Sequence, residues 1–176
     1  MSQQQNVRPF EESSCESILD TAKTVHAEET ARFNQFENKT NIGLAFTGVL
    51  LGAYLTYLST FKPAIKDESY LIYTIVFKIL ILGLLTIAII CFLKSIKTGE
   101  YKQVDLNNII DLEFAKDSPT KVKIEIAATY KSVIDQNKDR LKLKIEFYDK
   151  GLDYVTWGFS LFVFHFLIEE IIKYVK

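Results

Sequence analysis

The stretch "LIYTIVFKILILGLLTIAIICFL", residues 71–93, decides the class of this protein. Nearly all of its residues are apolar, and Lys78 carries its only charge. The hydrocarbon core of a bilayer is about 30 Å thick, and an α-helix crosses it with about 20 largely apolar residues. The segment meets that length, so we predict a transmembrane helix over residues 71–93.

Two further apolar blocks flank this segment. Residues 41–60 lie within "NIGLAFTGVLLGAYLTYLSTF", and residues 151–173 read "GLDYVTWGFSLFVFHFLIEEIIK", with an uninterrupted apolar run shorter than 20 residues. A soluble helical bundle is the alternative, but a soluble chain of 176 residues rarely needs helices that are apolar on every side. Neither block alternates with the period of two that a barrel strand shows. We therefore predict an all-α membrane protein with three transmembrane helices.

Charge near the helix ends predicts the orientation. Lys23, Arg32 and Lys39 flank the first span, and three lysines follow the second span at the start of residues 94–150. The loop 61–70 holds two lysines, and the end of the third span and the tail after it hold Lys173 and Lys176. By the positive-inside rule, the N-terminus and residues 94–150 are cytoplasmic and the loop is external.

The cytoplasmic regions are expected to be helical. No Gly or Pro interrupts residues 11–41, so one helix can run from the cytoplasm into the first span, and residues 104–116 carry an apolar face from Leu106 to Phe114. Ser118 as N-cap and Pro119 at the first position predict a helix start. A strand competes at "KVKIEI", but the unbroken length of 120–150 favours a helix that packs on the N-terminal helix or on a neighbouring subunit. Its near-heptad seam comprises Ile126, Tyr130, Val133, Asn137, Leu141 and Ile145.

Catalytic and nucleic-acid-binding functions are not expected. The chain shows no Gly-rich phosphate loop, nucleophile elbow or paired catalytic carboxylates, and neither His26 nor His165 is expected to bind a metal. We therefore predict no enzyme activity, no cofactor and no metal site. Residues 94–150 hold 12 Lys or Arg against 10 Asp or Glu with the signs interspersed, which indicates a solvated helix surface rather than a nucleic-acid interface.

Three polar residues within the spans are candidates to line a pore or the interior of the bundle: Lys78, His165 and Asp153. A charge at the centre of a span costs about 3 kcal/mol on insertion scales and usually faces a bundle interior or a wet path. Lys78 is also close enough to the outer end for its stem to lift the ammonium toward the headgroups. His165 either shares a polar track with Lys78 or is an interfacial residue among neighbouring phenylalanines.

Small residues in the first span are candidates for helix packing. Gly48 and Gly52 form a small-xxx-small pair, and Gly43 lies nearby. Such residues let helix backbones approach closely in lipid. The pattern is compatible with packing inside one chain and with self-association.

Two longer stretches resemble a known group of proteins. "RFNQFENKTNIGLAFTGVLLGAYLTYLS", residues 32–59, and "ATYKSVIDQNKDRLKLKIEFYDKGL", residues 128–152, are similar to segments of small bacterial membrane effectors from antiphage conflict systems. These include the few-helix effectors of cyclic-nucleotide or CRISPR-associated signalling and the SLATT-type proteins. The resemblance implies a homo-oligomer that permeabilises or depolarises the bacterial inner membrane when triggered. The chain has no recognisable nucleotide-sensor domain, so it also implies a soluble sensor or signal-generating partner.

Two functional hypotheses follow. In the first, the protein is an oligomeric pore or membrane-disrupting effector. In the second, it is a non-catalytic membrane anchor or scaffold whose cytoplasmic helices dock a soluble partner. A holin or a small transporter is a third option, although no inverted repeat or broken helix supports transport.

Overall fold

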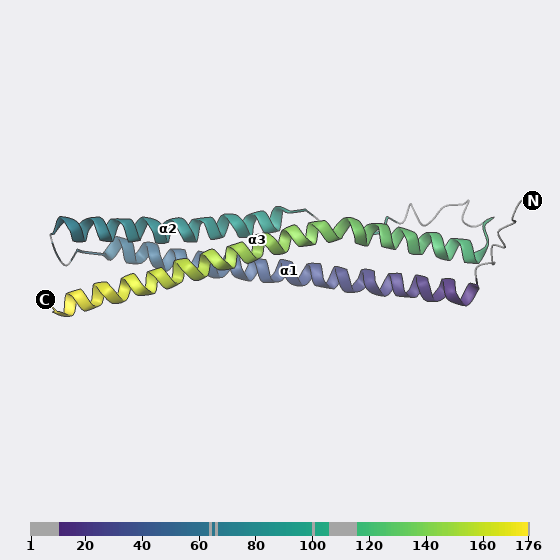
Figure 1. The fold of residues 1–176 in the computed structure, drawn as a ribbon, viewed down its shortest axis with the longest axis horizontal. Coiled ribbons are helices and arrows are strands. Elements are labelled where there is room, and N and C mark those ends of the chain that lie inside the picture. The colour runs from purple at the N-terminus through teal and green to yellow at the C-terminus, as the bar shows by residue number, and fades with distance from the viewer. Residues whose placement is uncertain (1–10, 64, 66, 100, 106–115, 176) are drawn as a thin grey trace, which may run out of the picture. The chain divides into compact units, whose positions relative to one another are not determined.

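Three long helices make up most of the chain. A computed structural model describes residues 11–63, 65, 67–99, 101–105 and 116–175. Its helices are α1 (Glu12–Thr60), α2 (Glu68–Lys97) and α3 (Pro119–Val175) (Figure 1). Within these described residues there is no strand, and each helix is long and apolar enough to cross a membrane. The predicted class, all-α with three candidate spans, is confirmed.

Polar side chains cap two of the helix starts. α3 begins at Pro119 as predicted, and the Ser118 hydroxyl accepts a hydrogen bond from the Lys121 backbone N–H at 3.4 Å. At the start of α2, the Asp67 carboxylate accepts one from the Tyr70 backbone N–H at 3.3 Å. Such caps satisfy N–H groups that have no partner in the first helical turn.

The helical interpretation of residues 120–150 is correct, and the competing strand at "KVKIEI" is wrong. α3 also extends further than expected, because it joins residues 120–150 and the third apolar block in one helix. α1 likewise joins the polar N-terminal region to the first apolar block, as predicted. The expected apolar face from Leu106 to Phe114 lies outside the described residues.

The chain divides into two compact units, which share α1 and α3. The first unit comprises Met1–Asn34 and Glu100–Leu141, and the second comprises Gln35–Gly99 and Lys142–Lys176. All of α2 and the three apolar blocks belong to the second unit.

In the first unit, α1 and α3 run in the same direction. The Lys123 ammonium lies 3.2 Å from carboxylate oxygens of both Glu12 and Glu16, and these hydrogen bonds raise the pKa of Lys123. Buried Asn137 donates to the Lys102 backbone carbonyl at 2.8 Å and accepts from the Lys102 backbone N–H at 2.9 Å. The other buried side chains of this unit are Cys15, Leu19, Phe33, Ala127 and Leu141.

A heptad seam follows the whole length of α3. Buried and half-buried residues recur at alternating steps of three and four, the spacing of coiled-coil core positions. In the first unit these residues are Ala127, Tyr130, Ile134, Asn137 and Leu141. In the second unit they are Lys144, Tyr148, Gly151, Val155, Gly158, Phe162, His165 and Glu169.

The predicted seam of α3 matches this register in part. Tyr130, Asn137 and Leu141 occupy it, whereas Ile126, Val133 and Ile145 lie one residue away and are half-buried. The three misplaced positions are β-branched apolar residues, each next to a residue of the strict spacing. At the last predicted step, the buried position is the charged Lys144 instead of its apolar neighbour Ile145.

The same spacing continues along α1. The buried and half-buried residues at this spacing in the first unit are Cys15, Leu19, Ala22, His26, Glu29 and Phe33. In the second unit those at this spacing are Phe36, Thr40, Gly43, Thr47, Leu50, Tyr54 and Tyr57. Parallel α1 and α3 therefore both present coiled-coil-like seams.

Phe92 of α2 packs against two glycines in the second unit. It is fully buried, and a Cβ placed on Gly43 or on Gly151 would lie 2.9 or 2.7 Å from its ring carbons. Glycine at both positions lets α1 and α3 lie close to the ring. A Cβ on Gly48 or Gly52 would meet nothing within 4 Å, so these two glycines are not used for packing within the described chain.

Candidate functional site: a buried polar cluster around Glu169

Glu169 is a carboxylate buried in the second unit between α3 and α2. Its relative exposure is 0%, and it directly follows Ile168 at the end of an apolar run of the third block. The Tyr70 hydroxyl donates to Oε2, and the Thr74 hydroxyl donates to Oε1 at 3.3 Å. Both donors are on the first turns of α2, so α2 supplies hydrogen bonds that replace those of water. A buried carboxyl group requires such partners because transferring it out of water unpaired is very costly.

His165 lies one turn before Glu169 on the same face of α3. It is also fully buried, with Nε2 4.0 Å from Glu169 Oε1 and Nδ1 3.4 Å from the Tyr73 hydroxyl. The 4.0 Å separation is an ion-pair distance if the imidazole is protonated, but it is too long for a direct hydrogen bond. Nε2 is buried and has no hydrogen-bond partner in the described chain.

An aromatic shell surrounds the imidazole. The rings of Tyr57, Tyr73 and Phe77 have centroids 6.3, 5.7 and 5.7 Å from that of His165. The Tyr57 hydroxyl is buried and, like Nε2, has no hydrogen-bond partner among the described residues. His165 thus lies inside the bundle between three helices, rather than among the neighbouring phenylalanines of its own helix.

The cluster combines two ionisable side chains with hydroxyl groups. Glu169 and His165 are both fully buried, and their polar neighbours are the hydroxyl groups of Tyr70, Thr74 and Tyr73. Ionisable residues in membrane segments usually mark ion pathways or proton relays.

Lys78, the charged residue of the opening stretch, is outside this cluster. Its ammonium lies over the Phe61 ring, 3.1 Å from the centroid, in a cation–π contact. The Tyr54 hydroxyl donates to its backbone carbonyl at 3.0 Å. Within the described chain, no hydrogen bond or ion pair joins Lys78 to His165. The side chain is directed to the residue that follows α1, at the end of the bundle where α1 connects to α2.

Asp153 is not brought together with the other two candidates. It is exposed on α3, four turns before Glu169, and contributes nothing to the buried cluster. Of the three polar residues singled out from the sequence, only His165 belongs to the site.

A second polar cluster surrounds Lys144 near the opposite end of α2. The Lys144 side chain is 1% exposed, and its ammonium lies 3.0 Å from a carboxylate oxygen of Glu37, which is 42% exposed. The Ser95 hydroxyl donates to the Lys144 backbone carbonyl at 2.9 Å and lies 3.4 Å from the Thr40 hydroxyl. Polar layers therefore lie toward both ends of the second unit. Between them are the apolar clusters of Tyr54, Ile81 and Leu85 and of Ala88, Phe92 and Val155.

The sequence analysis missed Glu169 because it lies in the polar "EE" pair that ends the third apolar block. One signal was present, since His165 and Glu169 are four residues apart and a helix places such a pair on one face. The contributions of Tyr70 and Thr74 had no local signal, because only the packing of α2 on α3 brings them to Glu169.

Comparisons with protein-family models, with curated proteins and with solved structures found no match.

Proposed function

We propose that this protein is a membrane effector that, as a homo-oligomer, lets ions or protons cross the bacterial inner membrane and thereby depolarises it. The observation that carries the proposal is the buried pair of ionisable residues, Glu169 and His165, within a helix able to span a membrane. In a purely structural span such residues are costly and rare. The cluster thus supports a role for these residues in moving charge.

The topology belongs to the same proposal. With the N-terminus in the cytoplasm, the connection between α1 and α2 is external, and the Glu169 cluster lies at the outer end of the bundle. The antiphage setting is supported by the sequence resemblance over residues 32–59 and 128–152. Expression in bacteria, with a potential-sensitive dye followed during phage infection, tests that setting separately from the conductance.

The conductance is tested with purified protein in liposomes that contain a pH-sensitive dye and a potassium gradient. Glu169→Gln removes the carboxyl group but keeps its size and one carbonyl oxygen, which can accept a hydrogen bond from Tyr70 or from Thr74. Glu170→Gln is the matched control, since Glu170 is the next residue, is 49% exposed and pairs with Lys173. We expect Glu169→Gln to lower proton or cation flux at least about tenfold, because it removes the titratable group, and Glu170→Gln to leave it within about twofold. An inactive wild type, or equal effects of the two variants, would contradict the proposal.

A membrane anchor for a soluble partner is the second candidate. It is favoured by an apolar groove in the first unit between α1 and α3. An anchor has no flux in liposomes, and charge reversals along residues 120–150 abolish its activity in cells, whereas Lys78→Leu and Glu169→Gln leave that activity intact.

A further inference from the structure

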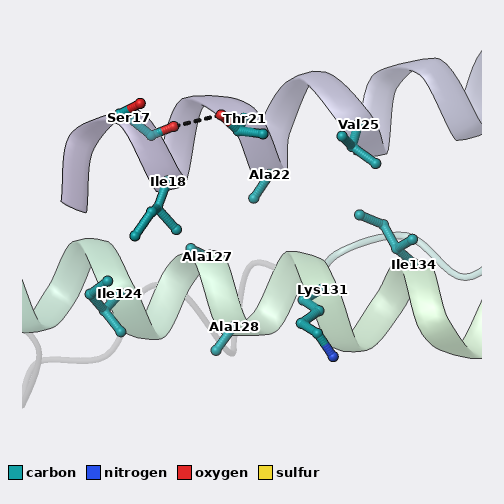
Figure 2. A pocket seen from close by; sticks show the side chains of 10 residues that line it. All are labelled: Ser17, Ile18, Thr21, Ala22, Val25, Ile124, Ala127, Ala128, Lys131 and Ile134. Atoms are coloured by element: carbon teal, nitrogen blue, oxygen red, sulfur yellow. Dashed lines mark hydrogen bonds between the residues drawn. The ribbon is translucent and has the colours of Figure 1, made fainter. Parts of the chain in front are cut away.

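The first unit has an apolar groove between α1 and α3. Its volume is about 540 Å³, and Figure 2 shows Ile18 and Ala22 directed from α1 toward α3. The polar or charged lining residues are Ser17, Thr21 and Lys131, and the apolar ones are Ile18, Ala22, Val25, Ile124, Ala127, Ala128 and Ile134.

The groove is an exposed second face of the helix pair, beside its buried seam. Ile18 is 51% exposed and Val25 is 38% exposed. The stem of Lys131 lines the groove, but in Figure 2 its amine is directed away from α1, and it pairs with Asp135 at 2.8 Å. The surface of the groove between the two helices is therefore mainly apolar. A contiguous apolar face outside the apolar blocks is typical of an interaction surface.

The two helices beside the groove carry opposite net charge. In residues 12–34, α1 has five acidic and two basic residues, a net charge of −3. In residues 119–141, α3 has five basic and three acidic residues, a net charge of +2. A partner that covers the groove is therefore complementary when it places a basic helix on α1 and an acidic helix on α3.

A second copy of this chain has that arrangement. When two copies meet face to face about a two-fold axis along the helices, α1 of each copy lies opposite α3 of the other. A two-fold axis across the helices would instead oppose α1 to α1, which places like charges together. In two copies inserted in one membrane with the same orientation, α1 runs in the same direction, as does α3. Insertion in the same orientation therefore requires the two-fold axis along the helices, which is also the arrangement that brings helices of opposite charge together.

We propose that this groove joins two copies of the chain in a parallel four-helix bundle, with Ile18 and Val25 of both copies in its apolar centre. The proposal rests on the proposed function only in requiring a homo-oligomer, and it assigns the contact that holds two subunits together.

The subunit count of the full chain tests this assignment, measured by native mass spectrometry and by sedimentation in mild detergent over a concentration series. Val25→Asp places a charge in the groove, at a side chain exposed enough for the fold to tolerate it. Ala31→Asp is the matched control, because it adds the same charge to an exposed position of α1 outside the groove lining. Val25→Ile keeps the surface apolar.

We expect Val25→Asp to raise the dissociation constant between subunits at least about tenfold, since an unpaired charge is strongly disfavoured in an apolar contact. Ala31→Asp and Val25→Ile should remain within about threefold of the wild type. A wild type that stays monomeric, or a Val25→Asp variant indistinguishable from Ala31→Asp, overturns the assignment. In either case another occupant, such as a soluble partner helix, covers the groove.

Liposome flux separates this result from the proposed function. If the Val25→Asp variant has the same subunit count and the same flux as the wild type, the groove assignment fails and the proposed conductance stands. If Val25→Asp dissociates the subunits but the wild type conducts nothing, the groove assignment stands and the conductance fails.

Discussion

Phe92 packs against two glycines, and replacing one of them tests how tightly the three helices pack. In Gly151→Ala, the new Cβ would lie 2.7 Å from Cε1, 2.9 Å from Cδ1 and 3.0 Å from Cζ of Phe92. Non-bonded carbon atoms are most favourable at about 3.5–4.0 Å, so the closest contact is about 1 Å too short. The ring cannot move aside freely, because Phe92 is fully buried and packed against neighbouring side chains.

The expected loss of stability follows from two opposing effects. Overpacking a dense core costs about 1–3 kcal/mol, and contact with a fully buried ring places this site near the upper value. Alanine is favoured over glycine inside a helix by about 1 kcal/mol. We therefore expect Gly151→Ala to lower the free energy of unfolding by about 2 kcal/mol. Gly48→Ala is the control, because its Cβ meets nothing within 4 Å, and it should be neutral or stabilising by up to about 1 kcal/mol.

Cys91 provides the assay. This thiol is free and 9% exposed, and it precedes Phe92 on α2. In a Cys15→Ser background, its labelling by a thiol reagent across a series of dodecyl sulfate concentrations reports unfolding of the second unit. Equal stability of Gly151→Ala and Gly48→Ala would refute the argument.

A second substitution identifies the clash itself. Phe92→Leu removes the ring atoms that oppose the new Cβ, so Gly151→Ala should cost about 3 kcal/mol less in that background, which leaves only the helix-propensity gain of about 1 kcal/mol. Additive effects would show that Phe92 is not the opposing group.

Two predictions concern charged residues near the ends of the units. Glu37→Gln should destabilise the second unit by about 1–3 kcal/mol, measured with the same Cys91 assay, because it removes a carboxylate that contacts a buried ammonium. Lys144→Met should cost less, because the Glu37 carboxylate that remains is partly solvated. Equal losses in the two variants would contradict this argument. Hydrogen bonds to Glu12 and Glu16 raise the pKa of Lys123. The stabilisation from this contact is therefore complete at pH values below the ordinary lysine pKa, and it is lost as the pH rises through the raised pKa. Circular dichroism between pH 9 and pH 12 should therefore show the first unit weakening in the wild type more than in Lys123→Met, and parallel pH profiles would contradict the assignment.

The segregation of apolar residues into three blocks determined the helical class with three candidate spans. Residues 71–93 are too long and too uniformly apolar for a surface helix, and in lipid a backbone is satisfied only by a helix or a closed barrel, whose alternating pattern is missing here. Ser118 and Pro119 likewise marked the start of α3, because capping is local chemistry. Periodicity located Tyr130, Asn137 and Leu141 in the seam but not Lys144, since polarity suggested exposure.

Tertiary structure decided everything that depends on a second helix. The sequence presents Gly43, Gly48 and Gly52 as one small-residue pattern, yet only Gly43 meets a neighbour, because Phe92 of α2 lies opposite it. Lys78 and Glu169 are both charged residues in or beside apolar blocks, but one side chain reaches Phe61 and the other is enclosed. Glu169 is held by Tyr70, 99 residues away in the chain. Hydrogen bonds over such a separation depend on which helix faces pack together, and no local pattern encodes that choice.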